Sequence, residues 1–323
     1  MSNSAITRIP ISHGKVLRET KARLATVSST PSLDAQVLLA HITGKPRTWL
    51  LAHPETLLTP HESQQIVEAL QKLESGFPLP YLLGEQEFFG LKFKITPDTL
   101  IPRPETELLV ETALAWLNQL PFHTEKGTEC EGVYAADIGT GSGCIAVSLA
   151  VHCPELHVVA TDLSSAALAV AQQNAEIHHV ADRITFLKAD LLDLQSFDQR
   201  LKIAAQDRSS AIHYPLPITH YSLLTANLPY IPTSTLYTLE VYRHEPTLAL
   251  DGGPDGLALI RPLLLQTATC LAPGGLILLE IEATQGKAAQ ELAHQHFPQA
   301  LIEIRPDLAG HDRLLVIQTS FPY

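Results

Sequence analysis

The spacing of apolar residues predicts a small helical domain over residues 1–85. Apolar side chains recur every three or four positions from Leu33 to Leu39 and again from Ile66 to Leu73. This is the period of an α-helix, and no strand-like alternation appears in these residues. Helix start and stop signals flank both segments. They are Pro31 or Ser32 and then Gly44-Lys45-Pro46 for the first segment, and Thr59-Pro60 and then Gly76 for the second.

Residues 86–100 change to an alternating pattern, QEFFGLKFKITPDTL. Alternation around a glycine predicts a short β-hairpin that turns near Gly90. An amphipathic helix is expected next, from Leu108 to Leu120, and the polar residues 121–132 are expected to form a loop. The hairpin is therefore interpreted as a joint between the helical domain and a third domain, residues 101–323.

From Val133 onward, apolar strands alternate with helices. This rhythm predicts an α/β fold, with a Rossmann-like and mainly parallel sheet that carries helices on both faces. Such a sheet binds its ligand outside the carboxyl ends of the strands. Residues 195–221 do not follow this alternation of strands and helices and are interpreted as a surface insertion. Strands are expected at 133–138, 158–161, 184–189, 222–226, 276–281, 301–304 and 314–319, and helices at 144–150, 165–178, 259–271 and 285–296.

Composition narrows the possible partners. The chain has 323 residues, of which 45% are hydrophobic and 17% charged, which suits a globular protein of more than one domain. Its formal charge of −12 disfavours a nucleic-acid partner, because phosphate backbones are held by Lys and Arg. No segment resembles a signal peptide or a membrane span, and the four cysteines form no C-x-x-C pair. The sequence therefore predicts a cytoplasmic protein with no membrane partner and no metal site.

A glycine-rich loop, Asp137-Ile138-Gly139-Thr140-Gly141-Ser142-Gly143, leaves the first of these strands and enters a helix. A dinucleotide-binding loop would need a glycine at the position of Cys144, and a nucleotide triphosphate loop would need Gly-Lys-Ser/Thr. Glycine lets the backbone approach a ligand closely. The carboxylate of Asp137 would repel a pyrophosphate but suits a cationic amino group. Cys144 itself is expected to pack rather than react, because no supporting base is apparent.

Acidic residues end the next two strands of the predicted sheet. Asp162 follows the second strand and can accept hydrogen bonds from both hydroxyls of a ribose. Asp190 follows the third strand and can accept from an adenine amino group. In this order, the loop and the two acids fit S-adenosylmethionine, which has an amino-acid group, a ribose and an adenine but no phosphate. The other interpretation is a glycine turn with unrelated strand-end acids, and the ordered set favours the cofactor.

The fourth strand ends in Asn227-Leu228-Pro229-Tyr230. Because the Pro-Tyr pair cannot continue a strand ladder, an amide, free carbonyls and an aromatic ring are expected together at the strand end. Such a group can hold a planar –NH2: the Asn227 side-chain oxygen and a backbone carbonyl each accept one N–H, and the Tyr230 ring packs on the plane. The segment indicates chemistry on an amide or amino nitrogen, although Asn-x-Pro-Tyr also occurs as a simple strand-ending turn.

Together, these residues resemble class I S-adenosylmethionine-dependent methyltransferases that act on planar nitrogen. Three stretches narrow the resemblance: Ile101–Glu107 (IPRPETE), His244–Arg261 (HEPTLALDGGPDGLALIR) and Asp307–Arg313 (DLAGHDR). With Tyr81–Gly90 and the helical front domain, they resemble HemK-type protein-(glutamine-N5) methyltransferases, which modify peptide chain release factors. The resemblance covers nearly the whole chain.

The resemblance implies a methyltransferase domain at residues 101–323 and a substrate-docking role for residues 1–85. It implies S-adenosylmethionine as the cofactor, and as substrate the glutamine of a Gly-Gly-Gln loop in class I release factors, held by Asn227–Tyr230. Arg103 and Glu105 either contact the substrate backbone or join the domains as an ion pair, and both possibilities stay open. The expected cofactor contacts are Asp137, Gly139, Thr140, Gly141, Ser142, Gly143, Asp162, Asp190, Leu191 and Asn227.

One position departs from the family pattern. The usual tetrapeptide is Asn-Pro-Pro-Tyr, and here Leu228 takes the second place; Asn-Leu-Pro-Tyr resembles ribosomal RNA adenine dimethyltransferases. Leu228 keeps a backbone carbonyl as acceptor, and Pro229 still restricts it to an extended conformation. The alternatives are an adenine-N6 methyltransferase that acts on RNA or DNA, which would need a basic groove, and a non-catalytic S-adenosylmethionine-binding protein.

Overall fold

The computed structural model describes residues 11–120, 133–192 and 220–320. The chain divides into two compact units, Met1–Glu85 and Gln86–Tyr323, and each is described by itself. The expected loop at 121–132 lies outside the described residues, as does the expected insertion at 195–221 up to residue 219.

The first unit contains five helices within its described residues. The two helices that the sequence predicts are α2 and α4. Gly44 ends α2 in the left-handed conformation. Thr59 begins α4 through a capping box with Glu62, in which each side chain accepts from the backbone N–H of the other residue. The five helices are α1 (His13–Leu24), α2 (Pro31–Thr43), α3 (Arg47–Ala52), α4 (Pro60–Glu74) and α5 (Leu79–Leu83).

The sequence does not predict helix α1, because the buried face of this helix is partly polar. His13, Val16, Thr20 and Leu24 are buried at helical spacing. Only Val16 and Leu24 among them belong to the hydrophobic core of the unit. The helical period is therefore present in the sequence without the hydrophobicity that normally reveals it.

The expected hairpin is present at the start of the second unit. Strands β1 (Glu85–Phe88) and β2 (Leu91–Lys94) flank a turn at Gly90, whose φ of 71° favours glycine. The Phe93 side chain is fully buried in a core of this unit. Residues 95–100, which the sequence analysis includes in the hairpin, lie outside both strands.

The second unit is built on a seven-stranded sheet in the order β5-β4-β3-β6-β7-β9-β8. The neighbouring pairs from β5 to β7 are parallel, and β9 is antiparallel to both of its neighbours. This confirms the predicted α/β fold and brings the carboxyl ends of four successive strands, β3 to β6, to one edge. The strands are β3 (Val133–Ile138), β4 (Leu156–Asp162), β5 (Ile184–Lys188), β6 (Tyr221–Ala226), β7 (Leu271–Glu280), β8 (Leu301–Pro306) and β9 (Asp312–Gln318).

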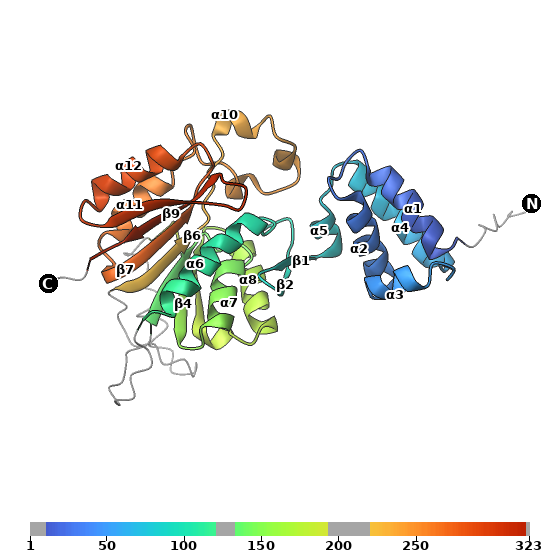
Figure 1. The fold of residues 1–323 in the computed structure, drawn as a ribbon, viewed down its shortest axis with the longest axis horizontal. Coiled ribbons are helices and arrows are strands. Elements are labelled where there is room, and N and C mark those ends of the chain that lie inside the picture. Colours follow the sequence, from blue (N-terminus) through green and yellow to red (C-terminus); the bar gives the residue numbers. More distant parts are fainter. Residues whose placement is uncertain (1–10, 121–132, 193–219, 321–323) are drawn as a thin grey trace, which may run out of the picture. The chain divides into compact units, whose positions relative to one another are not determined.

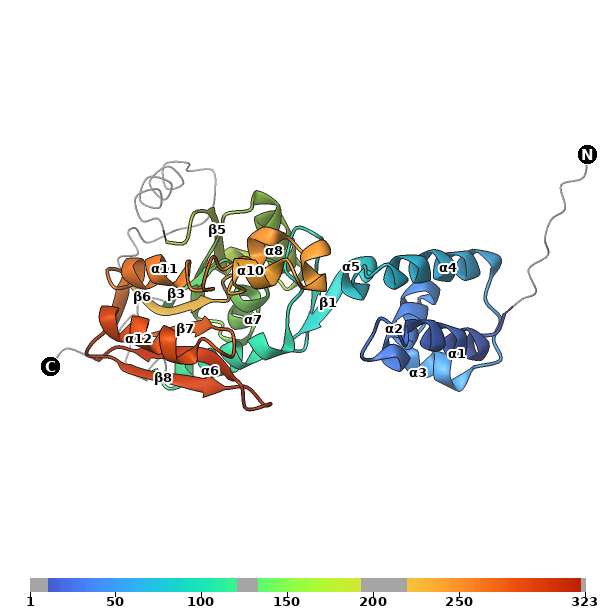
Figure 2. The same ribbon diagram turned by 90° about the horizontal axis from the view of Figure 1, so that it is seen from above.

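Helices cover both faces of this sheet (Figure 1 and Figure 2). Side chains of β7 alternate between two hydrophobic cores, with Leu278 in one and Ile277 in the other. Both faces are therefore apolar, as is usual for buried parallel strands. One face carries α6 (Glu107–Leu117), α7 (Cys144–His152) and α8 (Ser165–Ile177), and the other carries α11 (Ile260–Thr267) and α12 (Gly286–His296).

Short helices lie in the connections of the second unit. They are η1 (Pro104–Thr106), η2 (Ala181–Arg183), α10 (Thr233–Leu236), η3 (Glu240–Arg243) and η4 (Thr247–Ala249).

Some element boundaries differ from the sequence prediction. Helix α11 ends at Thr267, earlier than expected, and strand β7 already begins at Leu271. Leu271 pairs with Tyr221, and a register shift follows that accommodates Pro273-Gly274-Gly275. Because Pro and Gly are typical of a turn, this segment conceals the start of the strand in the sequence. Helix α6 likewise ends early, at Leu117.

Candidate active site

The glycine loop connects β3 to α7 at the carboxyl edge of the sheet. Gly139, Gly141 and Gly143 have φ values of 70°, 57° and 80°, in the left-handed region that other residues rarely adopt. Close packing adds a second reason at Gly143, where a Cβ atom would lie 3.0 Å from the Cβ of Ala171 on α8. The loop is therefore a tight turn into α7, whose first backbone N–H groups have no partner within the helix.

Asp137 lies beneath this loop. Its carboxylate is fully buried and accepts hydrogen bonds from the hydroxyls of Thr140, at 2.6 Å, and of Thr225 on β6, at 2.9 Å. Burial raises the pKa of Asp137 to about 6, although these hydrogen bonds act in the opposite direction. Asp137 does not border the cavity described below, so its contact with a cationic ligand group stays a prediction. In the structure, its two hydrogen bonds tie the loop to β6.

Asp162 ends β4 and turns both carboxylate oxygens toward backbone N–H groups. Oδ2 accepts from Gly141 in the loop at 2.9 Å, and Oδ1 accepts from Ser164 at 2.8 Å. Burial raises the pKa of Asp162, and these N–H groups limit the rise. Each oxygen keeps a lone pair for another donor. Asp162 can therefore hold the loop and still accept from the two hydroxyls of a ribose.

Asp190 and Leu191 follow β5. Asp190 is exposed, and Leu191 has a φ of 53°, an outlying value for a bulky residue. The Leu191 carbonyl accepts from the Thr161 hydroxyl at 3.1 Å, and the N–H of Leu192 donates to the Gln266 side chain at 2.9 Å. These bonds hold the backbone in a position where Asp190 and Leu191 both border the cavity described below.

Asn227, Leu228 and Pro229 follow β6 and border the same cavity. The Leu228 side chain is buried against the glycine loop, where a Cβ on Gly139 would lie 3.0 Å from its Cδ2. The side-chain nitrogen of Asn227 donates to the Thr106 hydroxyl at 3.0 Å, so the amide oxygen Oδ1 points away from Thr106. Leu228 therefore packs the tetrapeptide onto the glycine loop, and Asn227 keeps its oxygen for another donor.

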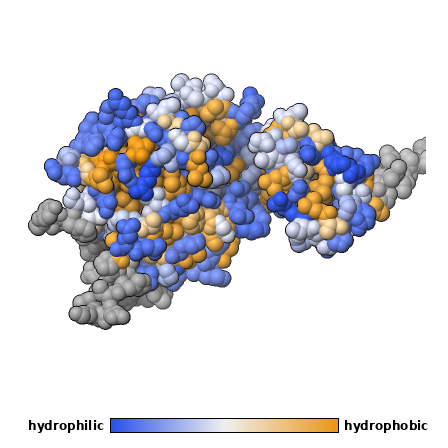
Figure 3. Space-filling view, in the orientation of Figure 1, coloured by the Kyte–Doolittle hydropathy of each residue, from blue (hydrophilic) through white to orange (hydrophobic). Residues whose placement is uncertain are grey.

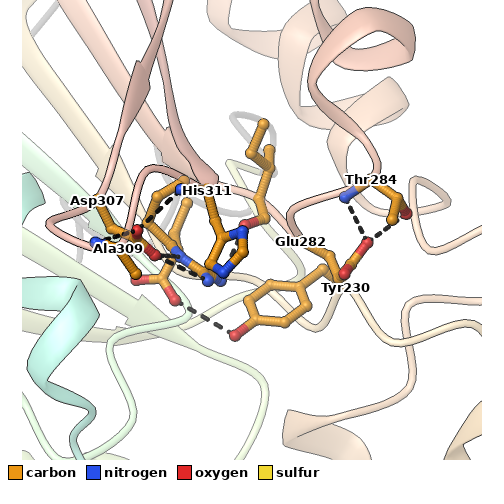
Figure 4. Close-up of polar contacts among 9 residues, drawn as sticks. Tyr230, Glu282, Thr284, Asp307, Ala309 and His311 are labelled. Atoms are coloured by element: carbon orange, nitrogen blue, oxygen red, sulfur yellow. Dashed lines mark hydrogen bonds and ion pairs between the residues drawn. The ribbon is translucent and has the colours of Figure 1, made fainter.

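Tyr230 lies behind the cavity instead of bordering it. Its hydroxyl donates to Oε1 of Glu280, at the end of β7, at 3.3 Å (Figure 4), and its carbonyl accepts from the Gln285 side chain at 2.9 Å. Burial and the neighbouring Glu280 carboxyl raise the pKa of the Tyr230 hydroxyl. Because Tyr230 is held at both ends in this position, the expected packing of its ring on a substrate amide stays a prediction.

The stretch Asp307–Arg313 forms a hydrogen-bonded turn between β8 and β9, near Tyr230 (Figure 4). One oxygen of Asp307 accepts from the N–H groups of Ala309 and His311, at 2.9 and 3.0 Å, and the other accepts from Arg313 at 3.2 Å. Arg313 also donates to the carbonyl of Ile281 at 3.4 Å. The turn therefore secures the backbone that follows β7.

The glycine-rich segment Asp251–Gly256 supports the tetrapeptide from behind. Asp251 forms a β-bridge with Ile231, and the N–H of Gly252 donates to the Ile231 carbonyl at 2.8 Å. A Cβ on Gly252 would lie only 2.7 Å from the Cα of Tyr230. The segment contributes no residue to the cavity wall. The segment is therefore a packed turn behind the tetrapeptide.

Replacing Gly256 by Ala is expected to destabilise the second unit by about 3 kcal/mol. Its φ is +76°, and a Cβ would lie 2.2 Å from both Nε2 of Gln285 and the carbonyl oxygen of Tyr230. Gly310→Ala is the matched control, because Gly310 has a φ of +83° but nothing within 4 Å, which predicts a loss of about 1 kcal/mol. Urea unfolding measures both losses. Equal losses would show that the close packing at Gly256 has no effect on stability.

Arg103 pairs with Glu245 and not with Glu105. Its guanidinium forms an ion pair with Oε1 of Glu245, whose Oε2 accepts from the N–H of Ile101 at 3.1 Å. Glu245 is only 6% exposed, whereas Glu105 is exposed and does not border the cavity. The ion pair lies within the second unit and joins two walls of the cavity, so the suggested Arg103–Glu105 pair is not formed.

These segments enclose one cavity of about 270 Å³ beyond the carboxyl ends of β3 to β6, where this type of sheet binds ligands. The predicted site residues that do not border it are Asp137, Gly143, Glu105 and Tyr230. The predicted site residues that border it are Arg103, Gly139, Thr140, Gly141, Ser142, Asp162, Asp190, Leu191, Asn227, Leu228 and Pro229.

Several residues of the site are not predicted from the sequence. Thr106 and Leu248 border the cavity, and both lie in stretches that resemble the family without an evident chemical role. Asn174 on α8 is fully buried and donates to the Ser142 carbonyl at 2.8 Å, while also bonding the backbone of Lys94. A lone Asn among the small apolar residues of a buried helix face is the signal that could have revealed this support.

Two further observations concern the residues that the structure describes. No three of their His, Cys, Asp or Glu side chains are grouped so as to hold a metal ion. Their helices are all too short or too polar to cross a bilayer.

The sheet order, the glycine loop after β3, the acids after β4 and β5 and the amide after β6 define a class I methyltransferase. Sequence comparison agrees with this class: a family model described as a methyltransferase domain matches residues 135–218, and one described as a PrmC N-terminal domain matches residues 15–84. A solved protein-(glutamine-N5) methyltransferase (release factor-specific) from Alicyclobacillus acidocaldarius is 26% identical, covers 71% of this chain and 99% of that chain, and has a TM-score of 0.40.

Relatives that match nearly the whole chain are release factor glutamine methyltransferases. The protein from Moorella thermoacetica is 42% identical over 93% of this chain and 95% of its own length. The protein from Bordetella pertussis is 40% identical over 88% of this chain and 93% of its own length. The chain belongs to the release factor glutamine methyltransferase family, which confirms the resemblance seen in its motifs.

Proposed function

We propose that this enzyme transfers a methyl group from S-adenosylmethionine to the side-chain nitrogen N5 of the glutamine in the Gly-Gly-Gln loop of class I peptide chain release factors. One observation carries the proposal. A single cavity joins a site of nucleoside type, formed by the glycine loop, Asp162 and Asp190, to the amide acceptor Asn227. Membership of the family supports the same reaction and the same class of substrate.

The chemistry of the cavity wall fits S-adenosylmethionine. Among the residues that border the cavity, Arg103 carries the one basic side chain, and Glu245 neutralises it. The side chains of the wall therefore offer no unpaired cation to a phosphate group. Asp162 and Asp190 would accept from ribose hydroxyls and an adenine amino group, and N–H groups at the start of α7 would suit a carboxylate. When bound, the cofactor supplies an electrophilic methyl group on a sulfonium.

In this proposal, Asn227 and Leu228 orient the acceptor nitrogen. An amide nitrogen is a poor nucleophile, because its lone pair is delocalised into the carbonyl. Oδ1 of Asn227 and the carbonyl of Leu228 accept its two N–H bonds, which directs the nitrogen at the methyl group and stabilises the positive charge that develops on it. The methylated nitrogen is strongly acidic and gives up one proton to solvent water, so no strong base is needed. Cys144 has no part in this, since burial raises the pKa of its thiol to about 12.

We propose further that the helical first unit docks the release factor. Large apolar side chains reach the surface of this unit, among them Leu51 and Leu57, which are 54% and 56% exposed. Figure 3 shows apolar patches on the unit. Exposed apolar patches of this kind commonly mark protein contacts. The match of residues 15–84 to a domain model of this family supports a role in the same function.

A methyl-transfer assay tests the proposed function. Labelled S-adenosylmethionine is offered with a class I release factor and with ribosomal RNA in parallel, and the labelled residue is mapped by mass spectrometry. We expect label on the glutamine of the Gly-Gly-Gln loop and none on a release factor in which that glutamine is replaced by alanine.

Other outcomes would refute the proposal in different ways. Label on adenine would show that Leu228 marks an adenine-N6 methyltransferase and that the release factor is not the substrate. Binding of S-adenosylmethionine without transfer to either acceptor would indicate a non-catalytic binding protein.

A further inference from the structure

Thr106 makes an unusual contact for a residue at the start of a helix. It stands at the N-cap position of α6, where a threonine hydroxyl normally accepts from a backbone N–H of the first turn. Its side chain makes no capping bond. It is only 2% exposed, and its hydroxyl oxygen accepts from Nδ2 of Asn227 at 3.0 Å. The hydroxyl therefore serves the amide of Asn227 and not its own helix.

The proton of the Thr106 hydroxyl has an acceptor nearby in Glu280. This carboxyl lies at the end of β7 and is 2% exposed. Burial raises the pKa of Glu280, and the Thr106 hydroxyl, the charge of Arg313 and the Tyr230 hydroxyl limit the rise. Oε1 accepts from Tyr230. Oε2 is buried and has no hydrogen-bond partner among the described residues, so it can accept a hydrogen bond from the neighbouring Thr106 hydroxyl.

A carboxylate at the end of this chain of contacts sets the direction of each hydrogen bond. In the arrangement inferred here, Glu280 is ionised and can only accept, so Thr106 turns its proton toward Glu280 and presents lone pairs to Asn227. Asn227 must then direct Nδ2 at Thr106 and keep Oδ1 for the cavity that it borders. The flipped amide would present N–H groups to the N–H groups of a substrate amide, and donors repel donors.

We propose that Thr106 and Glu280 are positioning residues, which hold the Asn227 amide with its oxygen toward the cavity. The inference rests on the proposed function, in which Oδ1 accepts from the substrate glutamine. Both residues act through Asn227, and neither takes part in the transfer of the methyl group. The Glu280 carboxyl also fixes the hydroxyl of Tyr230, so one buried acid organises two members of the tetrapeptide.

Thr106→Val and Thr106→Ser form a matched pair of variants. Valine keeps the shape of the side chain and removes the hydroxyl, and we expect kcat to fall about 10-fold, as when one hydrogen bond is lost. The Kd of S-adenosylmethionine should change less than about twofold. Serine keeps the hydroxyl and should restore kcat to within about twofold of wild type. A serine variant as slow as the valine variant would show that the methyl group of Thr106 matters and the hydroxyl does not.

Glu280→Gln tests the direction of the hydrogen bonds. The oxygen of the introduced amide would face the Tyr230 hydroxyl. The –NH2 group of the same amide would then face Thr106. Thr106 would then accept from that –NH2 and turn its own proton toward Asn227, which favours the flipped amide. We expect kcat to fall more than in Thr106→Val, about 30- to 100-fold, with little change in cofactor affinity. A wild-type kcat in this variant would overturn the role of Glu280.

A double-mutant cycle separates positioning from a general loss of structure. If Thr106 acts through Asn227, then Thr106→Val should change kcat no further in an Asn227→Ala background. A second fall of about 10-fold in that background would show that Thr106 acts independently of Asn227.

An NMR measurement tests the contact between Asn227 and Thr106 in the absence of any methyl acceptor. The side-chain –NH2 signals of Asn227 are identified by their loss in Asn227→Ala. We expect them to shift in Thr106→Val and in Glu280→Gln and to stay near their wild-type positions in Thr106→Ser. Unchanged signals in Thr106→Val would overturn this inference even if the release factor is methylated. A wild-type enzyme that leaves the release factor glutamine unmethylated would instead overturn the proposed function.

Discussion

Asn227→Ala is expected to lower kcat about 100- to 1000-fold, the range seen when a preorganised polar group facing the reacting atoms is removed. Alanine deletes the oxygen that would accept from the substrate amide, while the acids after β4 and β5 remain in the cavity wall. The Kd of S-adenosylmethionine should therefore change less than about tenfold. Single-turnover methylation of a release factor and calorimetric titration with the cofactor measure the two quantities.

Asn118→Ala provides the control for this experiment. Asn118 is exposed at the end of α6 and does not border the cavity, so its variant should match the wild type in both measurements. A kcat close to normal for Asn227→Ala would remove this residue from the mechanism. An equal loss of kcat and of cofactor affinity would show that Asn227 acts mainly by binding the cofactor.

Asp162→Ala is expected to raise the Kd of S-adenosylmethionine about 100-fold, which corresponds to about 2.8 kcal/mol. The variant loses the acceptors for the ribose hydroxyls, and the N–H groups of Gly141 and Ser164 lose their carboxylate. Each hydrogen bond to a charged group contributes about 1.5–3 kcal/mol. At saturating cofactor, kcat should fall much less, because Asn227 is intact. Isothermal titration and steady-state kinetics give the two values.

Two further variants sharpen this test. Asp162→Asn keeps the size of the side chain, but its –NH2 must face the N–H of either Gly141 or Ser164, so we expect nearly the same loss of affinity. Asp182→Ala removes an exposed carboxylate on η2 and should bind the cofactor as the wild type does. If Asp162→Ala bound S-adenosylmethionine with a Kd within about threefold of wild type, Asp162 would not be a ribose ligand.

The sequence predicts the centre of the fold well, because the local signals there are strong. Strand β3 is predicted residue for residue, as Val133–Ile138, since a central parallel strand buries both faces and is mostly apolar, here with Asp137 as the one charged residue. The meeting of Asp162, Asp190 and Asn227 at one cavity follows from a rule of topology, because each of them follows the end of one of the parallel strands.

Contacts that depend on register or on distant side chains are not predicted. Thr225 stands opposite Asp137 in the pairing of β6 with β3, and its hydroxyl therefore binds the carboxylate that the sequence assigns to a ligand. Arg103 finds its partner in Glu245, 142 residues away, and not in the neighbouring Glu105. Hydrophobic periodicity identifies elements and their faces, but it does not align the polar groups of separate elements.

The cavity has a cofactor half and an acceptor half, and each is held by a hydrogen bond between residues at a very different sequence separation. The bond between Gly141 and Asp162 spans 21 residues, whereas that between Thr106 and Asn227 spans 121. Closing a longer loop costs more chain entropy, and contacts distant in sequence form slowly. Pairing of β3, β4 and β5 brings together the glycine loop, Asp162 and Asp190 of the cofactor half, whereas the acceptor half also requires β6 in the sheet and the contact of Thr106 with Asn227. We therefore expect the place for the methyl donor to form before the place for the glutamine during folding.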